Sequence, residues 1–438
     1  MNFLQGKISK LYYTFLASAL GSTLITTVYA TVDSIAIGHY AGPTGAAAIA
    51  CVNPLWPCML SLSILFGMGG SVMMNNRRGA GNERQANEFF TTAALMTVIS
   101  SVVIAILFNL FMEEILTFFG AKGAVLEASL NYAEPFRYGA PAFTLCAAAA
   151  SFVRNDGEAI LPTIATAVGG VINVFGDVFF VFDFGLGLGL FGAGLATILG
   201  QTVSCLIILS YFFTKKCKLR FVIPRRFFSL LLKISSVGAS AAIIEIGFGS
   251  TTVAFNKIIS ENLTAAHLAV YGTASTVLIM FYCFYYAFGS ALQPIVSANY
   301  GANNTERVNK TLKIALISVV IVSLVFFAVA ELFPEMILNI YMDTDEEVLS
   351  IGPRIVRLYS LALLVASFAI VFCYYLQSVL RKGASTAVSL LRGVVLPIFF
   401  AFLIPLALGC DFIWLAVPLA ELVAAVFGAA CVFFVLRK

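Results

Sequence analysis

Long apolar runs alternate with short polar breaks along the whole chain. A run of about 20 residues, coiled as a helix, crosses the hydrocarbon layer of a membrane. The pattern therefore predicts an all-α integral membrane protein with twelve spanning helices in two sets of six. The first set is 11–38, 49–74, 89–111, 138–153, 160–182 and 188–213, and the second is 233–257, 265–291, 310–330, 358–379, 390–408 and 412–436.

Composition excludes several other classes of protein. Hydrophobic residues occupy 60% of the 438 positions and charged residues 11%, whereas soluble domains carry about 25% charge, so a soluble globular protein is excluded. The nine cysteines form no CxxC pair, which argues against a disulfide framework or a zinc site. No GxxxxGK[ST] phosphate loop and no clustered catalytic set occurs. The sequence predicts neither an ATPase nor an enzyme, and no cofactor.

Basic residues are placed unevenly along the chain. Most of the 26 lysines and arginines, Arg392 among them, fall on the side of the membrane that holds both termini. By the positive-inside rule that side is cytoplasmic. The densest basic stretch, 215–233, predicts a cytoplasmic linker that lies on anionic lipid headgroups rather than a nucleic-acid site. The basic residues expected on the opposite side are Lys122, Arg137, Lys257, Arg354 and Arg357.

Short motifs recur in the second half of the chain. GAGNER at 79–84 is followed 222 residues later by GANNTER at 301–307. Arg154 and Gly157 match Arg381 and Gly383 at offsets of 227 and 226. Chance similarity between Gly-rich turns is the alternative. A true repeat predicts two pseudo-symmetric six-helix lobes, 1–214 and 233–438, joined by a linker at 215–232, as in transporters whose halves rock about a central cavity.

Ionisable side chains at membrane depth are candidates for function, because a buried charge is costly unless it is paired, protonated or wetted. Asp33 and Asp177 lie at similar depths near the outer ends of the first and fifth spans. Asn173 lies one turn deeper than Asp177 on the same helix face, level with Thr197 of the sixth span. These four residues can line one polar pocket that holds a proton or a hard cation such as Na⁺. Separate acids that reach outward to the interface are the alternative.

Two further acids lie within the second set of spans. Glu245 and Glu421 are candidates for a second cation site or for the counter-charge of a cationic substrate, and a protonated, hydrogen-bonded core residue is the alternative for each. Tyr282 and Tyr286 belong to an aromatic run that can stack on a flat cationic drug or simply pack against lipid and protein. Arg137 has Glu134 as its nearest expected partner and Asp33 or Asp177 as more distant ones.

Several of these segments together resemble the multidrug and toxic compound extrusion (MATE) family. They are VYATVDSIAIG at 28–38, the stretch 173–197 that ends in GLFGAGLAT, QPIVSANYGA at 293–302, and the turns at Arg154/Gly157 and Arg381/Gly383.

The resemblance implies a twelve-helix, two-lobe exporter that moves organic cations outward in exchange for Na⁺ or H⁺. In that family an acid on the first span and the Asn, Asp and Thr of the fifth and sixth spans form a cation pocket, which here corresponds to Asp33, Asn173, Asp177 and Thr197. A Glu on the seventh span is characteristic of another branch, and Glu245 occupies that position. Carrying both features leaves the coupling ion open.

The sequence thus predicts a secondary antiporter of organic cations or amphipathic drugs. A lipid-linked oligosaccharide flippase of the same superfamily is the alternative, although its anionic cargo would favour basic groups in the cavity. We expect a monomeric, multi-pass protein of the bacterial plasma (inner) membrane. Its partners would be small organic cations and the lipid bilayer, with no nucleic acid.

Overall fold

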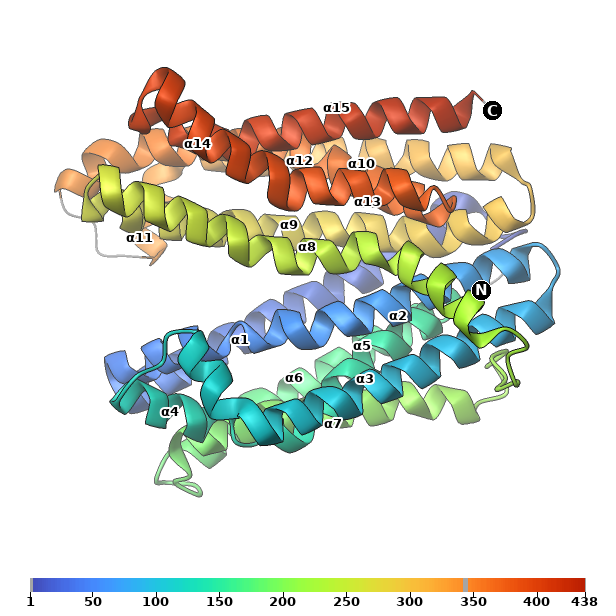
Figure 1. The fold of residues 1–438 in the computed structure, drawn as a ribbon, viewed down its shortest axis with the longest axis horizontal. Helices are drawn as coiled ribbons and strands as arrows, with labels where there is room; N and C mark the ends of the chain where they lie inside the picture. The colour runs from blue at the N-terminus through green and yellow to red at the C-terminus, as the bar shows by residue number, and fades with distance from the viewer. Residues whose placement is uncertain (1–2, 342–345, 438) are drawn as a thin grey trace. The chain divides into compact units, whose positions relative to one another are not determined.

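Helices account for nearly all of the described chain. The computed structural model describes residues 3–341 and 346–437, apart from the side chains of a few residues inside helices, and no strand occurs within these ranges. The first seven helices, labelled in Figure 1, are α1 (Ile8–Val52), α2 (Leu55–Gly79), α3 (Glu83–Phe118), α4 (Ala124–Ala133), α5 (Phe136–Asn155), α6 (Ile160–Val181) and α7 (Gly189–Ser210), and α7 continues into the 3₁₀ turn η1 (Tyr211–Phe213).

The second half begins with α8 (Phe227–Asn262). The elements that follow it are α9 (Ala265–Gly301), α10 (Thr305–Leu332), α11 (Pro334–Tyr341), α12 (Glu346–Ser378), α13 (Lys382–Leu390), the π-helical segment η2 (Leu391–Val395), α14 (Leu396–Leu408), the 3₁₀ segment η3 (Cys410–Leu415) and α15 (Ala416–Leu436).

Twelve helical segments correspond to the twelve predicted spans. Within the described ranges, eleven are long and apolar enough to cross a membrane. The twelfth is α5, whose 20 residues reach about 30 Å but include Arg137 and Arg154. Most helices run beyond the predicted ends because helical hydrogen bonding continues past the apolar stretch. The α4 helix, which the apolar pattern did not predict, lies between the third and fourth spans.

Packing divides the chain into two units. Unit 1 comprises residues up to 6 and 17–242, and unit 2 comprises residues 7–16 and 243 onward. The division between 242 and 243 falls inside α8, whereas the sequence predicts a linker at 215–232. The first part of α8 packs with unit 1, because Gly238 lies against the backbone of Leu65. The lobe limits 1–214 and 233–438 stay a prediction.

The helix ends preserve the internal repeat in their geometry. The side chain of Asn82 accepts a hydrogen bond from the Gln85 amide (3.0 Å) at the start of α3, and Asn304 accepts one from the Arg307 amide (3.3 Å) at the start of α10. Each Asn caps the orphan amides of a helix N-terminus. The residue before each cap, Gly81 or Asn303, has a positive φ of 77° or 56°. The repeat at an offset of 222 is therefore structural.

The second repeated turn needs a different alignment from the predicted one. Gly157 has φ 101°, and its amide bonds the carbonyl of Arg154 at 3.1 Å. The same geometry recurs at Leu380, with φ 57° and a 3.1 Å bond to the carbonyl of Gln377. The equivalent residues are thus 223 apart, and the predicted match to Arg381 and Gly383 is wrong. Backbone geometry is repeated here, whereas the Gly that suits it is not.

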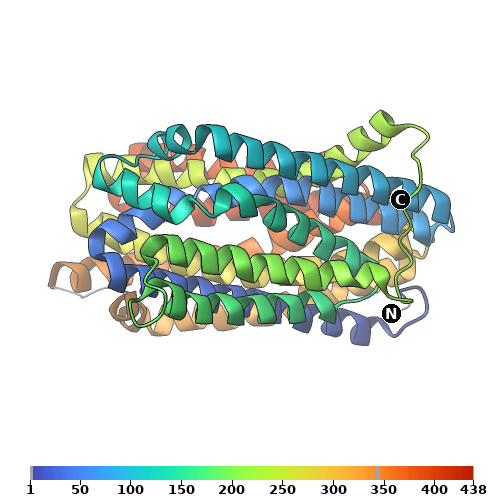
Figure 2. The same ribbon diagram turned by 90° about the horizontal axis from the view of Figure 1, so that it is seen from below.

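Close approach of α6 to α7 sets the frame of unit 1. The two helices run side by side (Figure 2). At their contact Gly169 faces the backbone of Gly200, where a Cβ on either residue would meet the other helix. The hydroxyl of Ser204 donates to the carbonyl of Ala165 at 2.9 Å. Small residues bring the two backbones together, so polar side chains one to two turns away meet directly.

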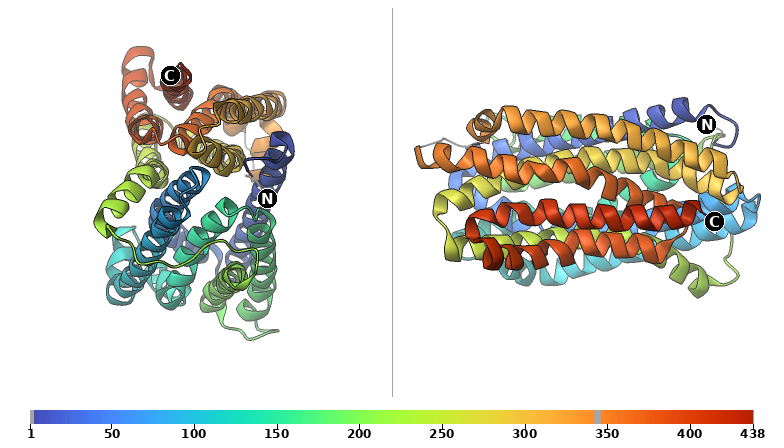
Figure 3. Two further views of the ribbon diagram at one scale, coloured as in Figure 1. Left: turned by 90° about the vertical axis from the view of Figure 1, so that its right-hand side faces the viewer. Right: turned by 90° about the horizontal axis from the view of Figure 1, so that it is seen from above.

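In unit 2, α12 lies beside α9, α10 and α15, and α14 lies beside α15 (Figure 3). The α12 helix is the most enclosed of the spanning segments described, with 67% of its most apolar window buried. Its neighbours therefore hold their polar side chains in a largely apolar interior.

Candidate functional site

A polar cluster lies between α6 and α7 in unit 1. The amide nitrogen of Asn173 donates to the hydroxyl of Thr197 at 3.1 Å, and the bond is buried. Asp177 follows Asn173 by one helical turn and has no exposed surface. Asp177 thus lies in the interior, near the C-terminal end of α6.

Asp33 of α1 reaches the same cluster. Tyr132 of α4 donates its hydroxyl to Oδ2 of Asp33 at 2.8 Å. The Tyr132 hydroxyl also interacts with Thr197. It lies close enough to Asp33 and Asp177 for the charges of both carboxyl groups to act on it. Asp33 and Asp177 lie close enough for their charges to affect each other. The structure therefore brings together the four residues expected to share one pocket; their role in binding an ion stays a prediction.

Tyr132 was missed by sequence reasoning. It lies in α4, a ten-residue helix between two spans, where the apolar pattern gives no signal. A short helix after a break at Gly123 (φ 53°) places this ring under the cluster, 2% exposed. The one signal in the sequence is the depth of Asp33. A buried carboxylate needs a hydrogen-bond donor, so a hydroxyl group can be expected nearby.

Several oxygens of the cluster have no hydrogen-bond partner. They are Oδ1 of Asp33, Oδ1 of Asn173 and both carboxyl oxygens of Asp177. Buried polar atoms are nearly always satisfied, so four unsatisfied acceptors in one place are unusual. A carboxylate and an amide oxygen can accept but not donate, so each lacks a positive partner. A proton or a hard monovalent cation would supply what the cluster lacks.

The composition of the cluster limits which ion it suits. In the described part of the chain, no group of three His, Cys, Asp or Glu side chains gathers in a way that could hold a metal ion. The cluster offers two carboxylates, one amide oxygen and one hydroxyl. These are the oxygen ligands that hard cations prefer, and they lack the soft ligands of a transition metal.

Arg137 takes the nearer of its two expected partners. Its Nε lies 3.0 Å from Oε2 of Glu134, three residues earlier. Its carbonyl accepts a hydrogen bond from the amide of Asn109 at 3.0 Å. The more distant link to Asp33 or Asp177 is not made among the described contacts. The cluster consequently keeps its negative character.

The buried charges of unit 2 are arranged differently. Arg392 binds Glu421 through two hydrogen bonds, Nε to Oε2 at 3.1 Å and Nη2 to Oε1 at 2.8 Å. Tyr282 donates its hydroxyl to Oε1 of Glu421 at 3.0 Å. The guanidinium lies over the Tyr282 ring, 5.4 Å from its centre, and Nη1 is 3.4 Å from the hydroxyl of Tyr286. Glu421 is therefore fully paired.

The placement of Arg392 corrects the sequence prediction. The apolar pattern predicts that the eleventh span begins at residue 390, which places Arg392 at the cytoplasmic surface. In the structure, residues 382–408 form one helical run, so Arg392 lies about ten residues inside it, roughly 15 Å from its start. The run starts earlier because 382–389, rich in Ser and Ala, is helical despite its modest apolarity. Arg392 is only 4% exposed.

The helix changes its hydrogen-bonding pattern at this arginine. Leu391–Val395 is a π-helical segment between α13 and α14. Such segments are rare and occur frequently at functional sites, because the extra residue redirects a side chain. The carbonyl of Gly393, freed from the regular ladder, accepts a hydrogen bond from Thr251 of α8 at 3.2 Å.

A small cavity adjoins the ion pair in unit 2. Its volume is about 60 Å³, enough for a few water molecules but below the range of a drug pocket. The polar residues around it are Thr251, Thr252, Tyr271, Ser275, Tyr282, Tyr286, Tyr359, Arg392 and Glu421. Glu245, the other predicted acid of this half, has a side chain outside the described residues.

Comparisons with known proteins bear on the whole chain. A sequence model described as MatE matches residues 19–179 and 241–403. These two matches cover most of both halves. The chain belongs to the MatE family. The paired match fits the repeat seen in the helix caps, since each half of the chain carries one copy.

Relatives and a solved structure agree with the MatE assignment. The probable multidrug resistance protein YoeA of Bacillus subtilis is 27% identical over 78% of this chain and 75% of its own length. The multidrug export protein MepA of Staphylococcus saprophyticus is 23% identical over 86% of this chain and 83% of its own. A multidrug resistance MATE family transporter of the MOP superfamily, solved outward-facing, superposes with a TM-score of 0.91 at 20% identity, covering 99% of this chain and 97% of that one.

Membership in the MatE family confirms several predictions. The protein is a multi-pass membrane transporter rather than an enzyme. Its twelve-helix fold is that of MATE transporters. The family resemblance inferred from the short segments is thereby confirmed as well.

Proposed function

We propose that this protein is a secondary active multidrug exporter that moves organic cations or amphipathic drugs outward in exchange for Na⁺ or H⁺. The observation that carries the proposal is the cluster of unsatisfied acceptors in unit 1. Relatives named as a probable multidrug resistance protein and a multidrug export protein support the substrate class. The substrates would be small molecules, and the protein would lie in the bacterial plasma membrane with both termini in the cytoplasm. We expect it to act as a monomer.

The coupling ion would bind where Asp33, Asn173 and Asp177 present free oxygens. Two buried carboxylates in one cluster repel when both are ionised, and a cation or proton relieves that repulsion. The occupied and the empty cluster therefore differ in charge. If the ion binds one conformation of the transporter more tightly than the other, its binding shifts the transporter toward that conformation. Tyr132 holds one oxygen of Asp33, so that the other stays directed at the ion.

The membrane potential is a sufficient energy source where the exchange moves net charge, as when an uncharged drug leaves for one entering cation. A one-for-one exchange of monovalent cations moves no net charge and is driven by the concentration gradient of the ion. One elementary charge moving down the potential releases about 2.3 kcal/mol per 100 mV. That energy corresponds to roughly a fiftyfold concentration ratio at room temperature. Export against a gradient of this size needs no ATP, in keeping with the absence of a phosphate loop from the sequence.

A lipid-linked oligosaccharide flippase is less well supported. Its pyrophosphate cargo needs exposed positive charge in the cavity. The one arginine that lines the unit 2 cavity, among the residues described there, is Arg392, and Glu421 neutralises it through two hydrogen bonds. The cavity therefore offers no net positive charge to an anion.

Efflux measurements in vesicles test the proposal. Purified protein is reconstituted and a fluorescent organic cation is loaded, after which Na⁺ and pH gradients are imposed separately. We expect one gradient to accelerate efflux, and the identity of that gradient names the ion. Asp177→Asn should remove the acceleration, whereas the matched control Asp183→Asn, an exposed residue six positions later, should keep it. Efflux indifferent to both gradients would overturn the proposal.

A further inference from the structure

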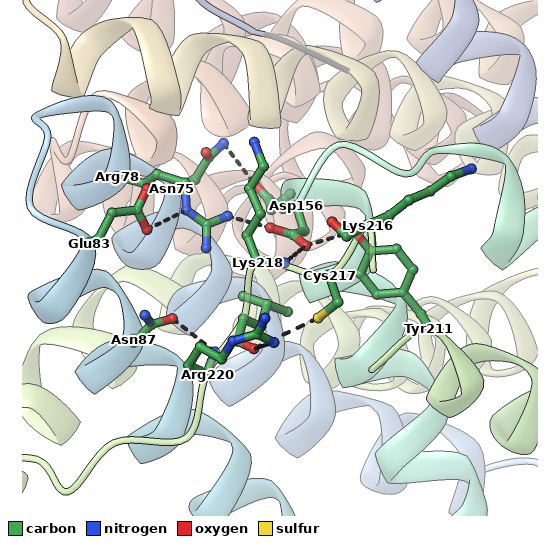
Figure 4. Close-up of polar contacts among 12 residues, drawn as sticks. Asn75, Arg78, Glu83, Asn87, Asp156, Tyr211, Lys216, Cys217, Lys218 and Arg220 are labelled. Atoms are coloured by element: carbon green, nitrogen blue, oxygen red, sulfur yellow. Dashed lines mark hydrogen bonds and ion pairs between the residues drawn. The ribbon is translucent and has the colours of Figure 1, made fainter. Parts of the chain in front are cut away.

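The basic linker of unit 1 is fixed to the helix ends rather than loose. Its backbone amides at every second position donate to side chains of the bundle: Lys218 to Asp156 Oδ2 at 3.0 Å, Arg220 to Asn87 Oδ1 at 3.1 Å and Val222 to Thr91 Oγ1 at 3.0 Å. Figure 4 shows the first two of these bonds. An extended segment anchored in this way presents alternate side chains to opposite faces.

The side chains at 217–220 follow that alternation. Cys217 and Leu219 are buried, at 2% and 4% exposed, whereas Lys218 and Arg220 between and after them are exposed. The anchored backbone therefore holds two cationic side chains outward at defined positions.

Asp156 is the centre of this anchoring. Besides the Lys218 amide, it accepts a hydrogen bond from the hydroxyl of Tyr211 at 2.7 Å and forms an ion pair with Arg78 at 2.5 Å (Figure 4). Its side chain has no exposed surface. Removing any of these three donors would leave part of a buried carboxylate unsatisfied, which costs free energy. The linker therefore stays in place against α2 and α5.

An apolar cleft lies directly beside the anchored linker. It has a volume of about 300 Å³ and is lined by side chains of α3, α5, the end of α7 and the linker. Phe221 of the linker packs over Phe90 of α3, with ring centres 4.9 Å apart. Along α3 the lining extends from Phe90 to Val98, about 12 Å. The cleft is thus a narrow apolar channel that begins at the basic segment and runs into the membrane.

The position of the cleft indicates which kind of molecule it can take. Its walls are spanning helices, and the neighbouring α3 residues Leu95, Val98 and Ile99 are 44–46% exposed. In a bilayer such a surface meets acyl chains. At the mouth of the cleft, residues 215–226 carry six basic residues and no acid. Exposed apolar side chains interleave with them, including Phe221 at 72% and Ile223 at 90%.

We infer that the cleft and the linker together form a binding site for one anionic phospholipid. An acyl chain lies in the cleft under Phe221, and the phosphate group lies against Lys218 and Arg220. The apolar wall supplies affinity for any lipid of suitable chain length, and the basic pair supplies the preference for a negative headgroup. Each basic residue near an anionic headgroup contributes about fivefold in binding.

Competition between two lipids on the purified, full-length protein tests this site. Phosphatidylglycerol and phosphatidylcholine with identical acyl chains are added together, and native mass spectrometry counts the lipids retained. We expect the wild-type protein to retain phosphatidylglycerol preferentially. In the double variant Lys218→Gln/Arg220→Gln, the ratio of retained phosphatidylglycerol to retained phosphatidylcholine should be about 25-fold lower. Lys310→Gln/Lys313→Gln, which removes two exposed charges from α10 outside the site, should leave it unchanged.

The cleft is tested separately from the charge. Ala94→Leu fills the apolar channel without changing any charge, so it should reduce retention of both lipids alike. Ala105→Leu, three turns along α3 and outside the cleft lining, is its control. Equal retention of the two lipids by the wild-type protein would overturn the inference, as would a preference that survives the loss of Lys218 and Arg220. Unchanged lipid retention in Ala94→Leu would also overturn it.

Discussion

The two halves of this transporter share a repeat but bury their carboxylates in opposite ways. In unit 1, Asp177 has neither carboxyl oxygen satisfied, and Asp33 has one oxygen free. In unit 2, Glu421 receives two hydrogen bonds from Arg392 and a third from Tyr282. The unit 1 cluster is poised to accept a positive charge, whereas the unit 2 pair already has one.

This contrast separates two uses of a buried acid. An ion pair with complete hydrogen bonding holds one arrangement, and removing either partner leaves an uncompensated charge. A carboxylate with free oxygens gains little from its neighbours, so it can be neutralised and released repeatedly. We therefore propose that coupling takes place in unit 1 and that the Arg392–Glu421 pair has a mainly structural role.

The largest effect on transport is expected from Asp177→Asn. The amide keeps the size of the side chain but removes its charge, and no hydrogen bond to Asp177 is lost. Efflux driven by an ion gradient should fall at least about tenfold. The free energy of unfolding of the protein should change by less than about 1 kcal/mol. Gradient-driven efflux and thermal melting are measured on the same preparation. A large loss of stability with normal coupling would reverse the assignment of roles.

The largest effect on stability is expected from Arg392→Met. It leaves Glu421 buried without its partner, which costs about 3–5 kcal/mol. The double variant Arg392→Met/Glu421→Leu should recover most of that loss, because apolar residues of similar volume often replace a buried pair without cost. Thermal melting in detergent gives both values. Lys313→Met is the control, and an Arg392→Met no less stable than this control would contradict a structural pair.

A smaller, diagnostic effect is expected from Tyr132→Phe. Loss of the hydroxyl removes the donor that holds Oδ2 of Asp33, so Oδ1 is no longer kept directed at the ion. A hydrogen bond to a charged group contributes about 1.5–3 kcal/mol, so the coupling ion should bind about tenfold less tightly. Efflux rates across a series of ion concentrations measure this.

The change should be absent from Tyr138→Phe, whose ring is 74% exposed. If Tyr132→Phe leaves the ion dependence of efflux unchanged, Tyr132 does not position Asp33.

The smallest effects test the repeat itself. Asn82→Ala and Asn304→Ala each remove the side-chain cap of an equivalent helix, and each should cost about 1 kcal/mol. Similar losses in thermal melting are expected, because the cap geometry is shared by the two halves. A loss confined to one half would show that the repeat does not extend to the energetics of its turns.

The sequence predicts the elements of this fold better than its contacts. Apolar runs locate the spans because each must be long enough to cross the membrane, and helical periodicity places Asn173 beside Asp177. Tyr132 could not be predicted, since its position depends on how a short helix folds back between two spans. Arg392 was misplaced because a polar stretch that packs inside protein has the same composition as one at the surface.

Ion binding to the purified protein tests the central claim most directly. A ligand that binds only the folded state raises the melting temperature in a saturable way, and at 100 times the dissociation constant it adds about 2.7 kcal/mol. Melting is followed while Na⁺ replaces K⁺ at fixed pH, and again while pH varies at fixed salt. We predict that one of these titrations stabilises the wild-type protein and the Asp183→Asn control but not Asp177→Asn. Equal stabilisation of Asp177→Asn would contradict the assignment of the coupling ion to unit 1.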